Sequence, residues 1–310
     1  MTIMTIKAKK FLKIIVKKLL PILTILFLLT VVWYFFTIYL NSAMQIDKYD
    51  KQGISWNISK LVLDTMSQER PKLPAPHQIA EEVWKTTVEK KITSKRSLLY
   101  HSSITLSSTI VGFILGTVLG VVLAISIVEN RAMESSLMPW IIASQTIPIL
   151  AIAPMIIVVL NSLGFSGLLP KALISTYLSF FPIVVGMVKG LRSPDIILVD
   201  LMKTYNSSKV DIFFKLRLPA SVPFLFTSMK VAIAISLVGA IVGELPTGAV
   251  AGLGARLLTG SYYGQTIQIW SALIMASILA ATLVFSIQAI GYLVSKKMGY
   301  TNEEAYAEHI

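Results

Sequence analysis

The sequence predicts an all-α polytopic membrane protein with six transmembrane helices and with both termini in the cytoplasm. Hydrophobic residues make up 55% of the 310 residues and charged residues only 14%, whereas a soluble domain has about 25% charged residues. Five long stretches contain no Asp, Glu, Lys or Arg, and a sixth is interrupted only by Lys230. Each is long enough to cross a bilayer core, which takes about 17–25 helical residues. This composition excludes an ordinary soluble enzyme, and the lack of cysteine excludes disulfides and Cys-ligated metals.

The first span follows a strongly basic N-terminal segment. Residues 1–18 contain six lysines and no acidic residue, and basic residues collect on the cytoplasmic side of spans. We therefore expect this segment in the cytoplasm, and the tail 295–310 on the same side after six spans. The predicted spans cover residues 19–40, 104–127, 139–160, 168–188, 222–243 and 267–294.

The segment between the first two spans, 41–103, is expected outside the cytoplasm. It carries ten basic and seven acidic residues, but long segments translocate with little regard to charge. A proline-rich stretch, 71–76, precedes a sequence whose apolar residues recur at helical spacing. We predict an amphipathic external helix over 77–90, with Ile79 and Trp84 on its apolar side.

The remaining five spans form a membrane core, 104–294, whose first helix carries a row of glycines. Gly112, Gly116 and Gly120 are four residues apart and therefore share one helix face, which allows close approach of a second helix. The favoured interpretation is helix packing within the chain. The alternative is a face that slides at a moving interface.

Three further polar side chains are candidates for a translocation pathway. Gln145 and Thr146 lie in the third predicted span, which we expect to kink at its prolines. Polar groups within a span face protein or water because they are costly in lipid. These two side chains line a pathway or make interhelical hydrogen bonds, and the sequence favours neither. Glu244 ends the fifth span and either borders the pathway or is a solvated acid. Lys230, within that span, is expected to snorkel towards the cytoplasm.

The cytoplasmic segment 189–220 predicts a short helix–turn–helix. Pro194 suits the first turn of a helix, and Asn206 tolerates the left-handed conformation that ends one. Ser208 and Asp211 have the spacing of a capping box for a second helix. Apolar residues lie among cations in this segment. These apolar residues either form a docking surface for a partner or pack against the chain's own helices.

This segment resembles the coupling loop of bacterial ATP-binding-cassette importer permeases. Their motif is E-A-A, three residues, G, nine residues, I-x-L-P, and the spacing matches throughout, although five of seven identities differ. The corresponding positions here are Asp200, Leu201, Met202, Asn206, Leu216, Leu218 and Pro219. Asn for Gly keeps the turn role, whereas Leu and Met are bulkier than the two alanines.

Most of the chain is similar to importer permeases of the nitrate/sulfonate/taurine type. The resemblance implies a multi-pass protein of the cell (inner) membrane that acts as a transport subunit and not as an enzyme. The implied partners are a cytoplasmic ATPase dimer, a second permease copy, an external solute-binding protein and the lipid bilayer. The implied solute is either a small oxyanion, such as nitrate or a sulfonate, or a nitrogen heterocycle, such as a pyrimidine, thiamine precursor or riboflavin-like compound.

No catalytic, metal or cofactor site is predicted. The sequence has no phosphate-binding loop of the G-x-x-x-x-G-K-[ST] type, no H-E-x-x-H motif, and three histidines far apart. The net charge of +12 is not a nucleic-acid signal, since half of it belongs to the N-terminal lysines. The alternative function is a stand-alone secondary transporter or channel. Few charges lie within the spans, which weakens that alternative.

Overall fold

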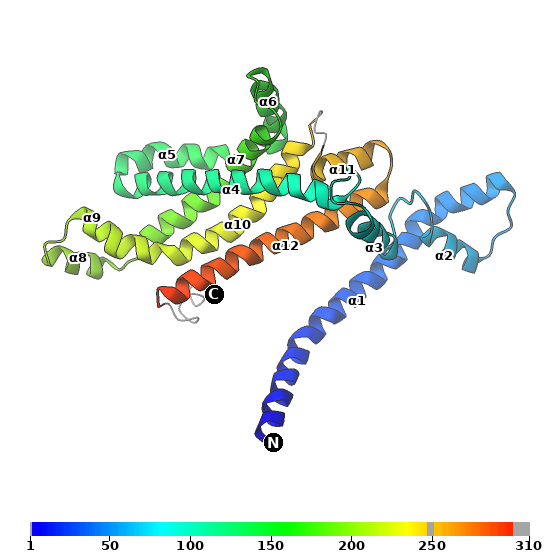
Figure 1. Ribbon diagram of the computed structural model, residues 1–310, viewed down its shortest axis with the longest axis horizontal. Coiled ribbons are helices and arrows are strands. Elements are labelled where there is room, and N and C mark those ends of the chain that lie inside the picture. The colour runs from blue at the N-terminus through cyan, green and yellow to red at the C-terminus, as the bar shows by residue number, and fades with distance from the viewer. Residues whose placement is uncertain (1, 247–250, 300–310) are drawn as a thin grey trace. The chain divides into compact units, whose positions relative to one another are not determined.

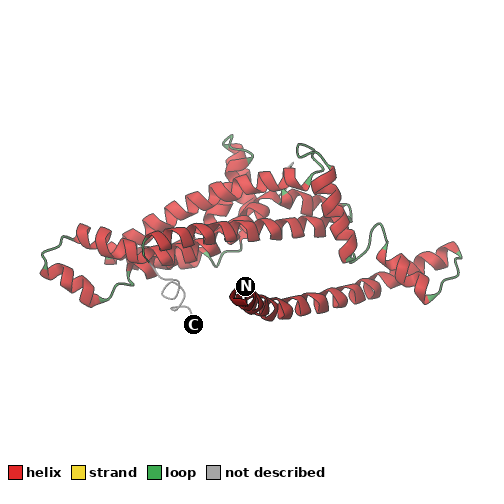
Figure 2. Cartoon of the chain, turned by 60° about the horizontal axis from the view of Figure 1, so that its bottom comes forward, coloured by secondary structure: helices red, strands yellow, loops and turns green. Residues whose placement is uncertain are grey.

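A computed structural model describes residues 2–246 and 251–299 of the chain, with side chains from residue 19 onwards. The described part is helical and contains no strand (Figures 1 and 2). It divides into two units, which are described separately. Unit 1 comprises residues 1–89 and 260–271, and unit 2 comprises residues 90–259 and 272–310. The predicted segment 1–18 lies outside the described side chains, and residues 300–310 of the predicted tail lie outside the described residues.

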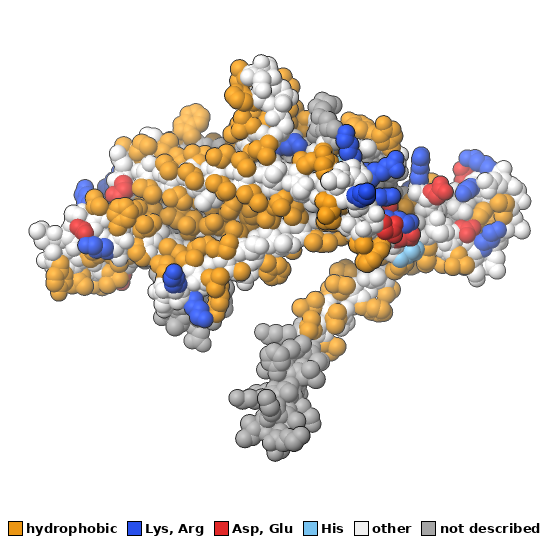
Figure 3. Space-filling model, viewed as in Figure 1, with side chains coloured by type: hydrophobic (Ala, Val, Ile, Leu, Met, Phe, Trp, Pro, Cys, Tyr) orange, Lys and Arg blue, Asp and Glu red, His pale blue; other side chains and the backbone are white. Residues whose placement is uncertain are grey.

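Five helical segments are long and apolar enough to cross a membrane, or six if one bent pair counts as a span. The five segments are Leu19–Gln52 of α1, Leu98–Glu129 (α4), Leu168–Leu191 (α7), Lys209–Glu244, which contains α9, η2 and α10, and Thr266–Lys297 (α12). The bent pair is α5 (Arg131–Ser144) and α6 (Ile149–Ser162). Many apolar side chains on these helices are exposed, as Figure 3 shows for unit 2. Such large apolar surfaces require lipid cover.

The third predicted span, 139–160, is not the single kinked helix expected from the sequence but two separate helices. The helix breaks between Ser144 and Ile149, and the two halves meet at an angle of 98°. Pro148 explains the position of the break, because proline lacks an N–H and disfavours helical geometry at the residue before it. Pro148 instead occupies the N-cap position of α6. The backbone amides of Gln145 and Thr146 close tight turns onto the carbonyls of Ile142 and Ala143.

Unit 2 is built on three helices, in which α7 packs against both α4 and α10 (Leu218–Glu244) (Figure 1). The glycine row of α4 faces α7. A Cβ atom on Gly112 would lie 2.7 Å from the carbonyl oxygen of Ala172, and one on Gly120 would lie 2.7 Å from Ile183. The row therefore allows the two backbones to approach closely within the same chain.

Serine and threonine hydroxyls join these three helices. Ser175 Oγ of α7 donates to the Ser236 carbonyl of α10 at 2.9 Å, and Ser236 Oγ donates to the Thr109 carbonyl of α4 at 2.9 Å. Thr176 Oγ1 lies 3.2 Å from the Gly112 carbonyl. In a membrane, where apolar side chains gain little by contacting each other instead of lipid, small residues and such hydrogen bonds hold helices together.

Unit 1 contains α1 (Thr2–Gln52), α2 (Ile58–Met66), α3 (Pro76–Trp84), the π-helical turn η1 (Lys85–Glu89) and the residues around the start of α12. Within unit 1, Asn41 of α1 is fully buried, and its side chain holds the segment that precedes α3. The Asn41 amide donates to the Leu73 carbonyl at 2.9 Å and accepts from the Lys72 amide at 2.8 Å. The amphipathic helix expected over 77–90 corresponds to α3 and η1.

We predict that Gly112→Leu destabilises the bundle. Its side chain would meet the backbone of α7, and overpacking of this kind costs about 1–3 kcal/mol. The matched control is Val118→Leu, on the exposed face of the same helix, which should change stability by less than about 0.5 kcal/mol. Thermal unfolding in detergent measures both variants. Equal melting temperatures would contradict tight packing of α4 on α7.

Candidate functional site

A buried polar cluster forms where α10 ends. The Glu244 carboxylate is fully buried and accepts hydrogen bonds from Thr105 Oγ1 of α4 at 2.9 Å and from the Gly254 amide at 2.9 Å. The Lys171 ammonium of α7 lies 3.7 Å from the carboxylate and donates to the Ala251 carbonyl at 3.1 Å. Glu244 thus joins α4, α7, α10 and the segment that follows α10.

The segment 251–254 is fastened to this cluster by consecutive backbone amides. The Gly252 amide donates to His101 Nδ1 at 3.0 Å, and the Leu253 amide donates to Thr105 Oγ1 at 2.9 Å. With the Gly254 amide on Glu244, these N–H groups lie at the beginning of α11 (Leu253–Tyr262). A carboxylate at this position accepts hydrogen bonds from amides that lack partners within the helix. Its negative charge also interacts favourably with the partial positive charge of the helix N-terminus.

Glycine is required at position 252 for two reasons. Its φ angle is +131°, which side chains disfavour, and a Cβ atom there would collide with the Glu244 carboxylate. The two glycines of Gly252-Leu253-Gly254 therefore allow the backbone to lie close to the Glu244 carboxylate.

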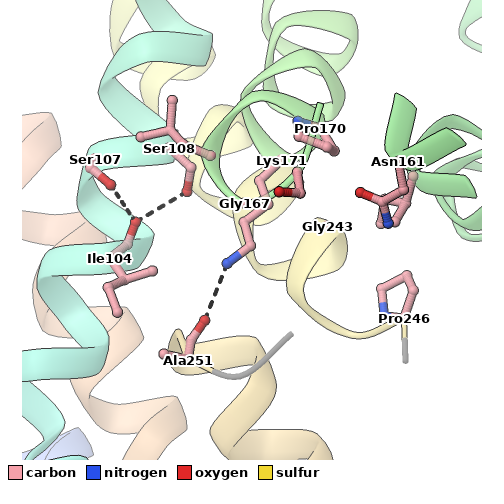
Figure 4. A pocket seen from close by; sticks show the side chains of 13 residues that line it. Ile104, Ser107, Ser108, Asn161, Gly167, Pro170, Lys171, Gly243, Pro246 and Ala251 are labelled. Atoms are coloured by element: carbon pink, nitrogen blue, oxygen red, sulfur yellow. Dashed lines mark hydrogen bonds between the residues drawn. The ribbon is translucent and has the colours of Figure 1, made fainter. Parts of the chain in front are cut away.

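An open cavity of about 430 Å³ lies beside the cluster (Figure 4). It is bounded by α4, α6, α7 and the end of α10, and Lys171 lies on its wall. Its volume falls within the range of about 300–1,000 Å³ that is typical of small-molecule sites. Besides Lys171, polar side chains on the wall come from Ser107, Ser108, Asn161 and Ser166.

The three pathway candidates from the sequence lie in two different places. Gln145 and Thr146 lie at the break between α5 and α6, where Gln145 Nε2 donates to Ser144 Oγ at 3.1 Å and Thr146 Oγ1 to the Ala143 carbonyl at 2.8 Å. Tyr177 of α7 donates to the Ser144 carbonyl at the same break. Neither candidate is among the described residues that line the cavity. Glu244 is buried behind the cavity.

The segment 189–220 forms two short helices joined by a tight turn. The first, α8 (Ile196–Thr204), has Asp195 as its N-cap. Asn206 adopts φ +55°, and among the described residues it is the one non-glycine residue with positive φ. Ser208 then caps α9 (Lys209–Ile212), accepting from the Asp211 amide at 3.1 Å. The left-handed turn and the capping box expected from the sequence are confirmed. The predicted start of the first helix is wrong, because α8 begins at Ile196 and Pro194 lies before its N-cap.

The surface of this helix–turn–helix is apolar and open. No residue of α8 is buried, and Ile196, Leu201 and Tyr205 are 72%, 51% and 79% exposed. The π-helical turn that follows α9 is held against α4, where the Arg217 guanidinium lies 3.5 Å from the Glu129 carboxylate. The motif position Met202 is half-buried, while Asp200 and Asn206 are exposed. Leu216, Leu218 and Pro219 are half-buried where η2 (Phe213–Arg217) passes into α10.

Sequence reasoning did not find Thr105, Lys171 or His101. The available signal was weak: Lys171 separates two uncharged stretches, and His101 and Thr105 lie at the start of an apolar helix. Spacing along the chain does not reveal that these residues meet Glu244. Among the described residues, no group of three or more His, Asp or Glu side chains could hold a metal ion.

We predict that Lys171→Met destabilises unit 2 by roughly 3–5 kcal/mol, because it leaves a buried carboxylate without its cation. The double variant Lys171→Met with Glu244→Gln should recover part of this loss, since no uncompensated charge remains. Thermal unfolding measures stability, and hydrogen exchange at the amides of Gly252 and Gly254 reports on the attached segment. Additive effects of the two substitutions would contradict their coupling.

Comparisons with known proteins place this architecture in one family. Residues 116–300 match the family described as "Binding-protein-dependent transport system inner membrane component". The chain is 33% identical to the riboflavin transport system permease protein RibX of Chloroflexus aurantiacus over 211 residues, which are 68% of this chain and 75% of RibX. It is 33% identical to the formylaminopyrimidine transport permease protein ThiX of Halalkalibacterium halodurans over 183 residues, which are 59% of this chain and 68% of ThiX.

A solved structure has the same fold. A chain of the inward-facing MetNI methionine ABC transporter superposes with a TM-score of 0.52 at 18% identity, covering 71% of this chain and 97% of that one. The apolar helices and the family match together identify a multi-pass membrane protein. The chain belongs to the family of binding-protein-dependent transport system inner membrane components.

Proposed function

We propose that the chain is the permease subunit of an ATP-driven importer for a small polar solute. The observation that carries this proposal is the exposed apolar helix–turn–helix of 189–220, with its left-handed turn at Asn206. Apolar side chains exposed to this extent require a partner or a lipid surface. The motif spacing of the loop supports a cytoplasmic ATPase as the partner of these side chains. Asp200, Leu201 and Met202 would lie at the contact.

The proposed topology has six spans, with α5 and α6 together forming one bent span. Residues 1–18, the coupling loop 189–220 and the tail 295–310 then lie in the cytoplasm, and residues 41–103 lie outside. Six basic residues in 189–220 against three acidic ones support the inner position of that loop. The membrane is the cell (inner) membrane, the site of binding-protein-dependent import.

The proposed mechanism is alternating access between two permease copies. ATP binding closes the ATPase pair, which moves the coupling loops and reorients a pathway between the copies. Gln145 and Thr146, at the break between α5 and α6, and Glu244, behind the cavity, are the proposed pathway residues. An external binding protein delivers the solute.

Two solute classes remain candidates for this importer. The riboflavin and formylaminopyrimidine permeases are 33% identical to the chain, whereas the nitrate import permease NrtB of Leptolyngbya laminosa is 24% identical. The higher identity supports a nitrogen heterocycle over an oxyanion as the transported solute.

The topology is tested with single cysteines, since the natural chain has none. Ser55→Cys, in unit 1, should react with a membrane-impermeant thiol reagent in intact cells. Thr204→Cys, in the coupling loop, should react only after the membrane is permeabilised. Labelling of Thr204→Cys in intact cells would contradict the proposed orientation.

The coupling role is tested by Leu201→Asp, which places a charge on the exposed face of α8. We expect retention of the ATPase in the affinity-purified complex, identified by mass spectrometry, to fall by about tenfold or more, as for loss of a central interface residue. Asn206→Pro should act similarly, because proline fixes φ near −65°.

The matched control is Ile58→Asp on α2, where Ile58 is 75% exposed. It carries the same kind of substitution on the segment that we place outside, so it should leave ATPase retention unchanged. Unchanged retention in Leu201→Asp, with normal membrane insertion, would refute the assignment of the loop.

A further inference from the structure

The cavity beside Glu244 differs from an anion site in its charge balance. Lys171 is the cation on its wall, but the Lys171 ammonium faces the Glu244 carboxylate at 3.7 Å and donates to the Ala251 carbonyl at 3.1 Å. Glu244 is fully buried and accepts two further hydrogen bonds, from Thr105 and Gly254. The positive charge of Lys171 is therefore balanced within the protein, and little of it acts on a solute in the cavity.

The other polar groups on the wall suit a neutral solute. The hydroxyls of Ser107 and Ser108 donate to the Ile104 carbonyl of their own helix, at 2.7 and 3.3 Å (Figure 4). Their oxygen atoms retain lone pairs and can accept hydrogen bonds. An oxyanion offers only acceptors, so binding it would require these hydroxyls to give up their hydrogen bonds to the Ile104 carbonyl. The side-chain amide of Asn161 has no hydrogen-bond partner among the described residues. This amide can both donate and accept hydrogen bonds.

Apolar groups complete the wall and favour a solute with an apolar face. They come from four different elements around the cavity, so a ring that enters it would contact aliphatic side chains and proline rings. These groups belong to Ile104, Ile157, Leu168, Pro170 and Pro246.

We infer that this cavity is a transit site for an uncharged solute that combines an apolar face with hydrogen-bond donors and acceptors, as a nitrogen heterocycle does. The inference rests on the proposed function and narrows its solute class. Asn161 and the Ser107 oxygen bind the polar edge, and the Lys171–Glu244 pair keeps the site electrically neutral.

The experiment uses the cysteine-free chain. Ser166→Cys places a thiol at the cavity wall and keeps Asn161 in place, and Ser162→Cys places one on a nearby exposed residue, which does not line the cavity. Both full-length variants are placed in lipid nanodiscs and treated with an anionic or a cationic methanethiosulfonate. The anionic-to-cationic rate ratio at residue 166, divided by the ratio at residue 162, measures the local charge. Protection is then measured with riboflavin, formylaminopyrimidine, nitrate or ethanesulfonate.

We expect a normalised ratio within about threefold of one, which corresponds to less than ~0.7 kcal/mol of net charge effect. Riboflavin or formylaminopyrimidine should slow labelling of Ser166→Cys and leave Ser162→Cys unaffected. Adding Glu244→Gln to Ser166→Cys should raise the ratio in favour of the anionic reagent, because Lys171 then loses its counter-charge.

Three outcomes would overturn the inference: a ratio of tenfold or more, protection by nitrate or ethanesulfonate alone, or no protection by any of the four compounds. Labelling does not require the ATPase. Failure here, with normal ATPase retention by the parent chain, would therefore reject the solute site and leave the proposed function standing. Loss of the ATPase assignment would leave the labelling result intact.

Discussion

The structure of unit 2 depends on the close approach of α4, α7 and α10. In a bilayer, hydrophobic contact between helices gains little over contact with lipid, so association relies on tight packing and interhelical hydrogen bonds. Glycines of α4 remove the side chains that would separate it from α7, and the hydroxyls of Ser175 and Ser236 tie the three backbones together. Thr105, Lys171 and Glu244 meet because these helices carry them to one end.

One helical segment joins the proposed coupling loop to the Glu244 cluster. Lys209–Glu244 runs from the second helix of the coupling loop to the buried carboxylate. At 1.5 Å per residue its length is about 54 Å. In the proposed importer, a movement imposed on the loop by an ATPase reaches Glu244 and the neighbouring cavity through this segment. The contrast between the ends fits such a role, because α8 is open and apolar while the Glu244 cluster is buried and hydrogen-bonded.

Sequence reasoning predicted most of the helical elements and the local structure of the coupling loop. Apolar stretches of sufficient length specify membrane helices, because every backbone polar group in lipid must be satisfied within the helix. The turn at Asn206 and the cap at Ser208 are also local, since each depends on residues at most three or four positions away. The prolines of the third span predicted a kink, but not a complete break at Pro148, because hydropathy continues unchanged through it.

By itself, the sequence determined the all-helical class, the apolar segments and the shape of the loop between α7 and α10. Only the tertiary structure decided what Glu244 does. Its partner Thr105 is 139 residues away, and the amides of Gly252 and Gly254 reach their acceptors only after the chain folds back across α4. Hydropathy and capping are properties of neighbouring residues, whereas the neutralisation of a buried charge depends on which helices pack together, and small-residue packing decides that.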